Sequence, residues 1–466
     1  MPIPVSLTAR WVPLALVGGI ALLLWISPRL FDASPAFVRG GILVVFTIAA
    51  WATGFFAEAI TTLLFFLFGA AFEIAKPSVV FSGFASPAWW LVLGGAITSV
   101  AVERTMLAQR LAGLVFGWLA ASYRSCLTAV ALAALGLAFL MPSSTARIMI
   151  LLPIVLALAD RLGLAPGRPG RAGLAMTVAA ASTLPPAAIL PANISNLVLL
   201  GAADALYGIK ITYGSYLLLH FPIFGVLKTA LLVEVSYRLF PEPHPFKPMP
   251  VASRAAATPM SNDECVVAAV LTTSLILFIT DVMHGVSPAW VSLAAGIVCL
   301  LPGIGPLTTQ NLSQINFGML VYVAGILSLG AVIADTGLGT ALSGALLKLS
   351  GITPGHDVTN LAIMIAIFMV VGLITTLIGL AGVLAPLAGN FAAASGLPVL
   401  SVLMLNVPVI STMLFPYQNF LIVLGMQYGG ISLRDGMRFC LIQAALTILV
   451  LFPLAYAWWS FLGYLP

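Results

Sequence analysis

The stretch that decides the fold runs from Cys126 to Leu158 and reads CLTAVALAALGLAFLMPSSTARIMILLPIVLAL. A helix that crosses the bilayer core needs about 20 apolar residues, so this segment is too long for one ordinary span. The residues MPSST at 141–145 interrupt it with a proline and three hydroxyl side chains. We therefore predict a re-entrant hairpin at 125–160, in which two half-helices enter and leave the membrane on the same side.

A second segment of the same kind runs from Leu361 to Phe391 and is interrupted near its middle by Thr375 and Thr376. It is again too long for one span and again breaks at polar side chains. We predict a second re-entrant hairpin at 359–393.

Apolar residues dominate the whole chain. Of its 466 residues, 61% are hydrophobic and only 7% are charged, whereas a soluble domain carries about 25% charged residues. The apolar runs are continuous rather than alternating, which favours helices over barrel strands. The predicted fold class is therefore all-α: a polytopic membrane protein of about 11 transmembrane helices plus the two hairpins.

The composition also argues against several classes of protein. The four cysteines are scattered, so neither a disulfide framework nor a metal-binding spacing is visible. No nucleotide-binding loop supports a pump driven by its own ATPase. The net charge of +5 is interpreted as a signal of membrane topology, and no nucleic-acid partner is expected.

Most Lys and Arg fall on the cytoplasmic side when the amino terminus is placed there. The predicted location is a bacterial inner membrane.

A polar stretch at 241–263, rich in proline and small residues, is predicted to be a cytoplasmic linker between two similar halves. The halves align in the same order at three places. The pairings are Leu91 with Tyr322, Pro153 with Pro386, and Asn196 with Asn419. Repeated halves with broken helices are typical of secondary transporters, so we predict two inverted repeats.

The hairpin tips and the polar breaks that follow them resemble the divalent anion/sodium symporter (DASS) family of the ion transporter superfamily. In that family each tip carries Ser-Asn-Thr, followed by small residues and Leu-Pro-Ile, and each half also breaks a helix at Thr-Pro-Pro-Asn. Here the first tip reads SSTAR at 143–147 and ends in LPI at 152–154. The counterparts of the broken helices are PANISN at 191–196 and PYQN at 416–419.

This resemblance implies a homodimer in which each subunit has a scaffold domain and a transport domain that moves as an elevator. The scaffold would comprise 1–122 and 264–357, and the transport domain would comprise 123–240 and 358–466. The resemblance also implies a small anionic substrate, such as a di- or tricarboxylate, sulfate or a related organic anion, and transport driven by sodium.

Two departures from the family pattern bear on sodium. Ser144 stands where the first motif has asparagine. The second motif reads Thr376-Leu377-Ile378 and has lost two of three polar side chains. We therefore expect weaker sodium dependence than in the family at large.

An anion that leaves water needs donors of comparable strength. Half-helix amino termini supply unpaired backbone N–H groups and the positive end of the helix dipole. We expect polar side chains at the breaks to surround one anion site near the midplane, although they could also serve only as caps or interhelical hydrogen bonds. The candidate substrate-binding residues are Ser143, Ser144, Thr145, Arg147, Asn193, Asn196, Thr375, Thr376, Gln418 and Asn419. Ser144 and Asn196 are also the candidate sodium ligands.

Arg147 lies in an otherwise apolar half-helix. A central arginine costs about 2.5 to 3.5 kcal/mol there, so intramembrane charges are functional by default. It could be a fork for a substrate carboxylate or a tethered cation in the place of a sodium ion. The other interpretations are an ion pair with Glu103 or Glu58, and snorkelling to the cytoplasm. Lys228 is expected to snorkel, and His220 to make an interhelical hydrogen bond.

The sequence thus predicts a secondary active transporter of small anions, either sodium-coupled with weakened dependence or an anion exchanger. We do not expect an enzyme, and we expect no cofactor apart from the sodium ion. An arsenite or sodium/proton carrier of the same superfamily is the alternative among transporters. An integral-membrane enzyme would need a cluster of His, Asp or Glu at one membrane face. A channel is the third alternative, because the broken helices do not distinguish a channel from a transporter.

Overall fold

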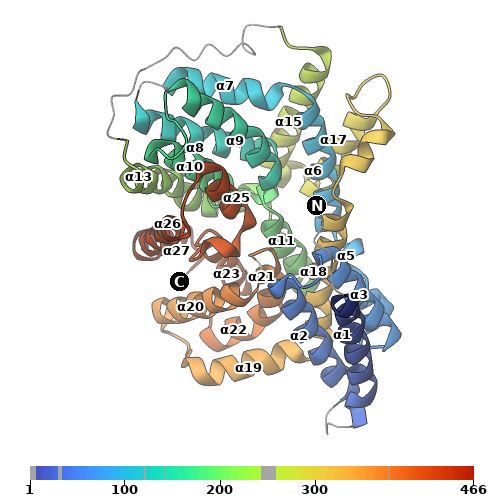
Figure 1. The fold of residues 1–466 in the computed structure, drawn as a ribbon. Helices are drawn as coiled ribbons and strands as arrows, with labels where there is room; N and C mark the ends of the chain where they lie inside the picture. Colours follow the sequence, from blue (N-terminus) through green and yellow to red (C-terminus); the bar gives the residue numbers. More distant parts are fainter. Residues whose placement is uncertain are drawn as a thin grey trace.

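The computed structural model describes residues 7–29, 34–119, 122–141, 143–242, 259–375 and 377–465. These residues form helices joined by turns, with no β-strand among them (Figure 1). The predicted all-α class is confirmed. The predicted linker at 241–263 lies mostly at 243–258, outside the described residues.

Most helices from the start of each predicted half lie on the right of the view in Figure 1, whereas α7 extends to the left across its top and α19 across its bottom. From the first half these are α1 (Leu7–Ile26), α2 (Pro35–Thr53), α3 (Glu58–Ala71), α6 (Pro87–Arg104) and α7 (Leu107–Leu119). From the second half they are α15 (Asn262–Ile279), α16 (Asp281–His284), α17 (Pro288–Leu300), α18 (Phe317–Asp335) and α19 (Leu338–Ser350).

The crossing of α6 and α17 joins these two sets of helices. A Cβ atom on Gly94 would lie 2.3 Å from the carbonyl oxygen of Ser292, and one on Gly296 would lie 3.2 Å from that of Gly94. The Ser292 hydroxyl also donates to the Leu91 carbonyl at 3.1 Å. Small residues allow two membrane helices to approach at backbone distance. A larger residue at Gly94 would separate them.

The first long apolar segment is interrupted where the sequence predicted. Its helices are α8 (Tyr123–Leu140) and α9 (Ser144–Arg161). The chain continues through α10 (Pro169–Ala181), the short turns η2 (Pro185–Ala188) and η3 (Leu190–Ala192), and α11 (Ile194–Tyr207). Prolines in η2 and η3 lack the N–H that an α-helix needs, which explains why the chain turns there instead of continuing.

The second segment is interrupted in the same way after α20 (Asp357–Ile374). It resumes as α21 (Leu377–Leu384) and α22 (Ala388–Ser395), followed by α23 (Val399–Met404) and α24 (Asn406–Ile410). A short turn η7 (Pro416–Gln418) then leads into α25 (Phe420–Gly429). That the two interrupted segments re-enter the membrane, and that the halves are inverted repeats, remain predictions.

Each half ends in a long helix that contains a π-helical stretch. In the first half α12 (Tyr213–His220) runs through η4 (Phe221–Leu227) into α13 (Lys228–Leu239). In the second half α26 (Leu433–Leu446) runs through η8 (Thr447–Leu451) into α27 (Phe452–Phe461). The π stretches pack against each other. Such stretches are frequently found at functional sites.

Six of the described helices are long and apolar enough to cross a membrane, or seven when α6 and α7, bent by 70°, count as one span. Several others are apolar but shorter, at 10–17 residues. The outer surface exposes large apolar side chains, such as Leu449 (73% exposed) and Phe461 (79% exposed). Apolar surface of this extent is typical of a protein that faces lipid. The chain is an integral membrane protein, and the predicted number of spans stays a prediction because short helices divide several of them.

Candidate functional site

Arg147 lies directly after the first hairpin tip and contacts the break between α10 and α11, which we call the first break. The Ser143 side chain caps α9 by accepting from the Ala146 N–H at 3.1 Å. Arg147 therefore lies in the first turn of the helix, where it is fully buried at 0% exposure. Its guanidinium donates to the carbonyl of Met141 and, at 2.9 Å, to the hydroxyl oxygen of Ser144.

The same guanidinium also reaches the place where the following helix is broken. Its Nη2 atom donates to the carbonyl of Ser182 at 2.9 Å and to that of Ala192 at 3.0 Å. Ser182 ends α10, and Ala192 belongs to η3 just before α11. One fixed cation thus joins the first hairpin tip to both sides of the break. Arginine suits this task because its planar fork carries five N–H donors.

These contacts decide between some interpretations of Arg147. No ion pair is recorded for it among the described residues, and its partners are Ser144 and three backbone carbonyls rather than Glu103 or Glu58. The side chain is also buried within the protein and does not snorkel to the surface. The ion-pair and snorkelling interpretations are therefore wrong. The substrate fork and the tethered cation both stay proposals.

Asn193 and Asn196 lie at the start of α11 and have different tasks. The Asn193 side chain caps the helix by accepting from the Ser195 N–H at 3.2 Å. Asn196 is 1% exposed, and its amide group donates to the carbonyl of Ile189 at 2.9 Å and to that of Pro186 at 3.4 Å. Both asparagines thus stabilise the break.

Three buried polar atoms around this break have no recorded partner within the described part of the chain. They are Nε of Arg147, Oγ of Ser182 and Oδ1 of Asn196. Buried polar atoms are nearly always hydrogen-bonded in native proteins, so unpaired ones need an explanation such as a ligand or water. A set with a cationic donor, a hydroxyl and an amide oxygen suits a polar ligand.

The hydroxyls of the first tip are half-buried. Ser143 uses its oxygen as the cap of α9, and Ser144 accepts from Arg147. For the Thr145 hydroxyl no hydrogen bond is recorded among the described residues. Thr145 is therefore the predicted site residue of this tip that is most available to a ligand.

The predicted site residues of the second half lie at the second hairpin tip and at the break before α25, which we call the second break. None of them is charged. Thr375 ends α20, and its hydroxyl donates back to the carbonyl of Val371 at 3.0 Å. Thr376, the other predicted residue here, lies outside the described residues. The Asn419 side chain caps α25 by accepting from the Leu421 N–H at 3.0 Å, as Asn193 does in the first half.

Gln418 holds the second break together. Its Oε1 accepts from the backbone N–H groups of Leu414 at 2.8 Å and Phe415 at 2.9 Å. Its Nε2 donates to the carbonyl of Gly372, near the end of α20, at 3.0 Å. The neutral carboxamide thus links the break to the second hairpin, as the guanidinium of Arg147 links the first break to the first hairpin.

Two serines that were not among the predicted site residues connect the two halves. The hydroxyl of Ser195, at the start of α11, donates to the carbonyl of Leu377 in the second tip at 3.1 Å. The hydroxyl of Ser411 donates to the carbonyl of Leu184 in the first break at 3.2 Å. The breaks of both halves therefore belong to one region. A buried hydroxyl beside a proline-rich break is the signal that could have identified them.

Lys228 and His220 lie in the first long helix and are both fully buried. The Nε2 atom of His220 lies 3.3 Å from the sulfur of Met404, and its ring packs on Tyr216 and Trp459. His220 therefore contacts other helices, as expected. The expectation that Lys228 snorkels is wrong, because its ammonium nitrogen is held inside the protein by side chains of α26 and η8.

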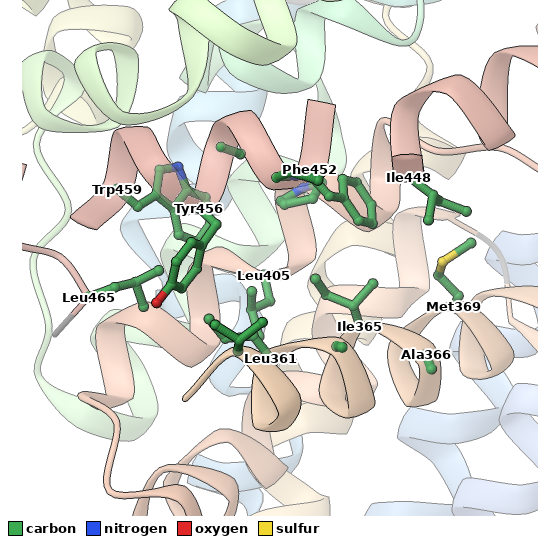
Figure 2. A pocket seen from close by; sticks show the side chains of 15 residues that line it. Leu361, Ile365, Ala366, Met369, Leu405, Ile448, Phe452, Tyr456, Trp459 and Leu465 are labelled. Carbon is green, nitrogen blue, oxygen red and sulfur yellow. The ribbon is translucent and has the colours of Figure 1, made fainter. Parts of the chain in front are cut away.

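A small cavity of about 30 Å³ adjoins the first break at Leu140 and Pro191, and two larger ones lie away from the breaks. One of about 540 Å³ runs between α20 and α27. Figure 2 shows Leu361, Ile365 and Met369 of α20 opposite Phe452 and Tyr456 of α27. Its lining is almost wholly apolar, so it lacks the donors that an anion needs. Another, of about 500 Å³, is bordered by Asp204, Lys210 and Asp281. The chemistry of the breaks, rather than cavity size, identifies the candidate site.

Comparison with known proteins adds a family match. The model of the family described as "Sodium:sulfate symporter transmembrane region" matches residues 7–465. The chain is also similar to a protein of Cupriavidus necator described as "Membrane protein", with 26% identity over 393 residues. That alignment covers 80% of this chain and 76% of the relative.

Proposed function

The chain belongs to the sodium:sulfate symporter family, and from this premise we propose that it is a secondary active transporter of small anions. The proposed substrates are sulfate, a di- or tricarboxylate, or a related organic anion. The proposed site lies at the two breaks, around Thr145, Arg147 and Asn196 in the first half and Gln418 in the second.

The observation that carries this proposal is the buried guanidinium of Arg147. It is 0% exposed and is held by neutral oxygens, with no recorded carboxylate partner among the described residues. A buried charge without a counter-ion is costly, and an anionic substrate would neutralise it. Donors without a recorded partner among the described residues are Nε of Arg147 and the hydroxyl of Ser182, and the half-buried hydroxyl of Thr145 is a further donor for such a substrate.

The same contacts bear on sodium. Of the two predicted sodium ligands, the hydroxyl of Ser144 already accepts a hydrogen bond from Arg147, whereas Oδ1 of Asn196 has no recorded partner among the described residues. A fixed positive charge beside them would also repel a second cation. The first break therefore fits sodium poorly, and we propose weakened sodium dependence or anion exchange.

The remaining features of the proposal follow the resemblance to the DASS family. We propose a homodimer in which the segments 123–240 and 358–466 form a transport domain that moves as an elevator against the other helices. The proposed orientation places the amino terminus in the cytoplasm and the protein in a bacterial inner membrane. The links through Ser195 and Ser411 support one rigid transport domain, because they tie the first and second breaks together.

Counterflow into proteoliposomes tests the function. Vesicles preloaded with unlabelled sulfate or succinate are diluted into the labelled anion, in sodium or in choline buffer. Protein-free vesicles are the control. We expect saturable accumulation of a divalent anion that persists in choline buffer and rises when the vesicles are preloaded. Uptake that never saturates would indicate a channel, and the absence of uptake of every anion tested would contradict the proposal.

A further inference from the structure

Lys228 occupies an unusual place for a lysine. It is the first residue of α13, directly after the π stretch η4, and is 0% exposed. Its Nζ atom donates to Oε1 of Gln443 and to Oγ1 of Thr447, each at 2.5 Å. Thr447 is the first residue of the other π stretch, η8. The lysine therefore joins the two long helices at the point where both depart from α-helical geometry.

The recorded partners of Lys228 do not match a permanent ammonium group. An ammonium has three N–H donors, whereas a neutral amine has two. Two acceptors are recorded for Nζ, both uncharged, and no ion pair is recorded for it among the described residues. Thr447 also donates its own proton to the Gln443 carbonyl at 2.6 Å, so its oxygen is free to accept. Two acceptors satisfy the neutral form and leave a charged form one partner short.

Gln443 connects the lysine to the second break. Its Nε2 atom donates to the carbonyl of Met413 at 2.6 Å. The next two backbone N–H groups, those of Leu414 and Phe415, are held by Gln418 of the candidate site. A change at the lysine that moves Gln443 therefore moves the loop that positions Gln418.

In the first half a tyrosine hydroxyl, instead of a carboxamide, donates to the backbone of the break. There the Tyr216 hydroxyl donates to the carbonyl of Ala187, in the turn η2 of the first break, at 2.7 Å. The hydroxyl of Tyr216 is used in this bond, whereas the carboxamide of Gln443 donates through Nε2 to Met413 and accepts through Oε1 from Lys228. Tyr216 packs its ring on His220. A hydrogen bond from the linking side chain to an ionisable group, however, is recorded, among the described residues of the two links, only for Gln443 and Lys228.

The ionisable groups around Lys228 are few. Helix α13 packs against α8, α10, α26 and η4. Cys440, one turn before Gln443 on α26, is a buried thiol on the face of α26 toward which the lysine reaches. The other ionisable groups on these elements are Tyr123, Arg124, Cys126, Arg171, Glu234, Tyr237, Arg238, Arg434, Asp435 and Arg438. Glu234 is bonded to Arg124 and Arg238 at the exposed end of α13, away from the lysine.

We propose that Lys228 is the proton-binding site of the carrier, an inference that rests on the proposed transport function. The neutral amine of this conformation takes one proton from water to become an ammonium in another conformation, and it returns the proton to water when Gln443 and Thr447 enclose it again. The adjacent π stretches provide backbone that can shift by one residue and open the site. Through Gln443, the charge on the lysine changes the second break and so couples proton movement to anion movement.

Proteoliposomes that contain a trapped pH dye test this proposal. Uptake of labelled sulfate and of labelled succinate is measured together with internal pH, over a range of external pH. In the parent we expect uptake to vary with pH and each anion to move with protons. Lys228→Met should still bind and carry the anion but lose both the proton movement and the pH dependence. Lys348→Met, at an exposed lysine of α19, is the matched control and should behave as the parent.

Thr447→Val keeps the lysine and removes one acceptor, so it serves if Lys228→Met does not fold. It should shift the pH of half-maximal uptake to higher pH, because Thr447 accepts from the amine in the enclosed, neutral conformation and its loss destabilises that form relative to the open ammonium form. Anion uptake without proton movement in the parent, or an unchanged pH profile in Lys228→Met or Thr447→Val, would overturn this proposal alone. No anion uptake by the parent would overturn the proposed function with it.

Discussion

The first and second breaks solve the same structural problem with different side chains. Both have an asparagine that caps the helix after the break, Asn193 in the first half and Asn419 in the second. In the first half a guanidinium then ties the break to its hairpin, through Arg147. In the second half a carboxamide does so, through Gln418. The caps are alike, whereas the ties differ by a full positive charge.

This difference separates two tasks within one candidate site. Among the described residues of the two breaks a fixed charge is present at the first, so this is the place where the charge of a substrate would be recognised. The second break can offer neutral donors and shape, and its tip has Leu377 and Ile378 where the resemblance to the DASS family implies polar side chains. The proposed weakening of sodium dependence rests on both departures. The variants below test this asymmetry, from the largest expected effect to the smallest.

Arg147→Gln should have the largest effect. A glutamine can replace at most part of the fork, so carbonyls such as those of Ser182 and Ala192 lose their donor. A hydrogen bond that involves a charged group is worth about 1.5 to 3 kcal/mol, which is roughly ten- to hundredfold in affinity. We expect uptake of sulfate or succinate into proteoliposomes to fall by that factor.

The sodium response of the same variant tests the tethered cation. Without the guanidinium the oxygens of the first break become free, so the residual uptake should depend more steeply on sodium than uptake by the parent. Arg161→Gln, at the exposed end of the same helix, is the control and should leave both measurements unchanged. Steep sodium dependence in the parent that is the same in Arg147→Gln would rule out the tethered cation.

Gln418→Leu should have a smaller effect than Arg147→Gln. It removes the acceptor of the Leu414 and Phe415 N–H groups and the donor to Gly372. Each neutral hydrogen bond contributes about 0.5 to 1.5 kcal/mol, against about 1.5 to 3 kcal/mol for each bond of the charged guanidinium, so the loss of uptake should be smaller than in Arg147→Gln. The sodium response should not change, because no cation is displaced. Gln427→Leu, an exposed glutamine of α25, is the control. A larger loss than in Arg147→Gln would reverse the proposed division of tasks.

The positions of these breaks were predictable, but the contacts of Arg147 and Lys228 were not. Residues such as Ser143 and Asn419 indicate the start of a helix in the sequence, because their short side chains can accept hydrogen bonds from the free N–H groups of the first turn. Arg147, by contrast, is held by the carbonyls of Ser182 and Ala192, and a backbone carbonyl leaves no mark in the sequence. The sequence predicts that Lys228 snorkels. This prediction fails because the position of a residue along one helix does not show which side chain of another helix, here Gln443, it contacts.

Asn193→Ala and Asn419→Ala test the part of the comparison in which the halves agree. Each substitution removes one cap, from the Ser195 N–H in the first half or the Leu421 N–H in the second. Loss of such a cap costs about 1 kcal/mol. We expect both variants to lower the thermal unfolding midpoint of the purified protein by similar amounts. Markedly unequal shifts would show that one asparagine has a task beyond capping.

Ser195→Ala should have the smallest effect and tests whether the breaks act together. Its hydroxyl donates to the Leu377 carbonyl, which joins the charged first break to the neutral second tip. The loss of one neutral hydrogen bond costs about 0.5 to 1.5 kcal/mol. If the two breaks form one site, uptake should fall a few-fold, and the loss in the double variant with Gln418→Leu should differ from the product of the single losses. Residues in one network couple in this way, whereas independent sites add their free energies. Strict additivity in proteoliposome uptake would mean that the two breaks act as separate sites, each with its own chemistry.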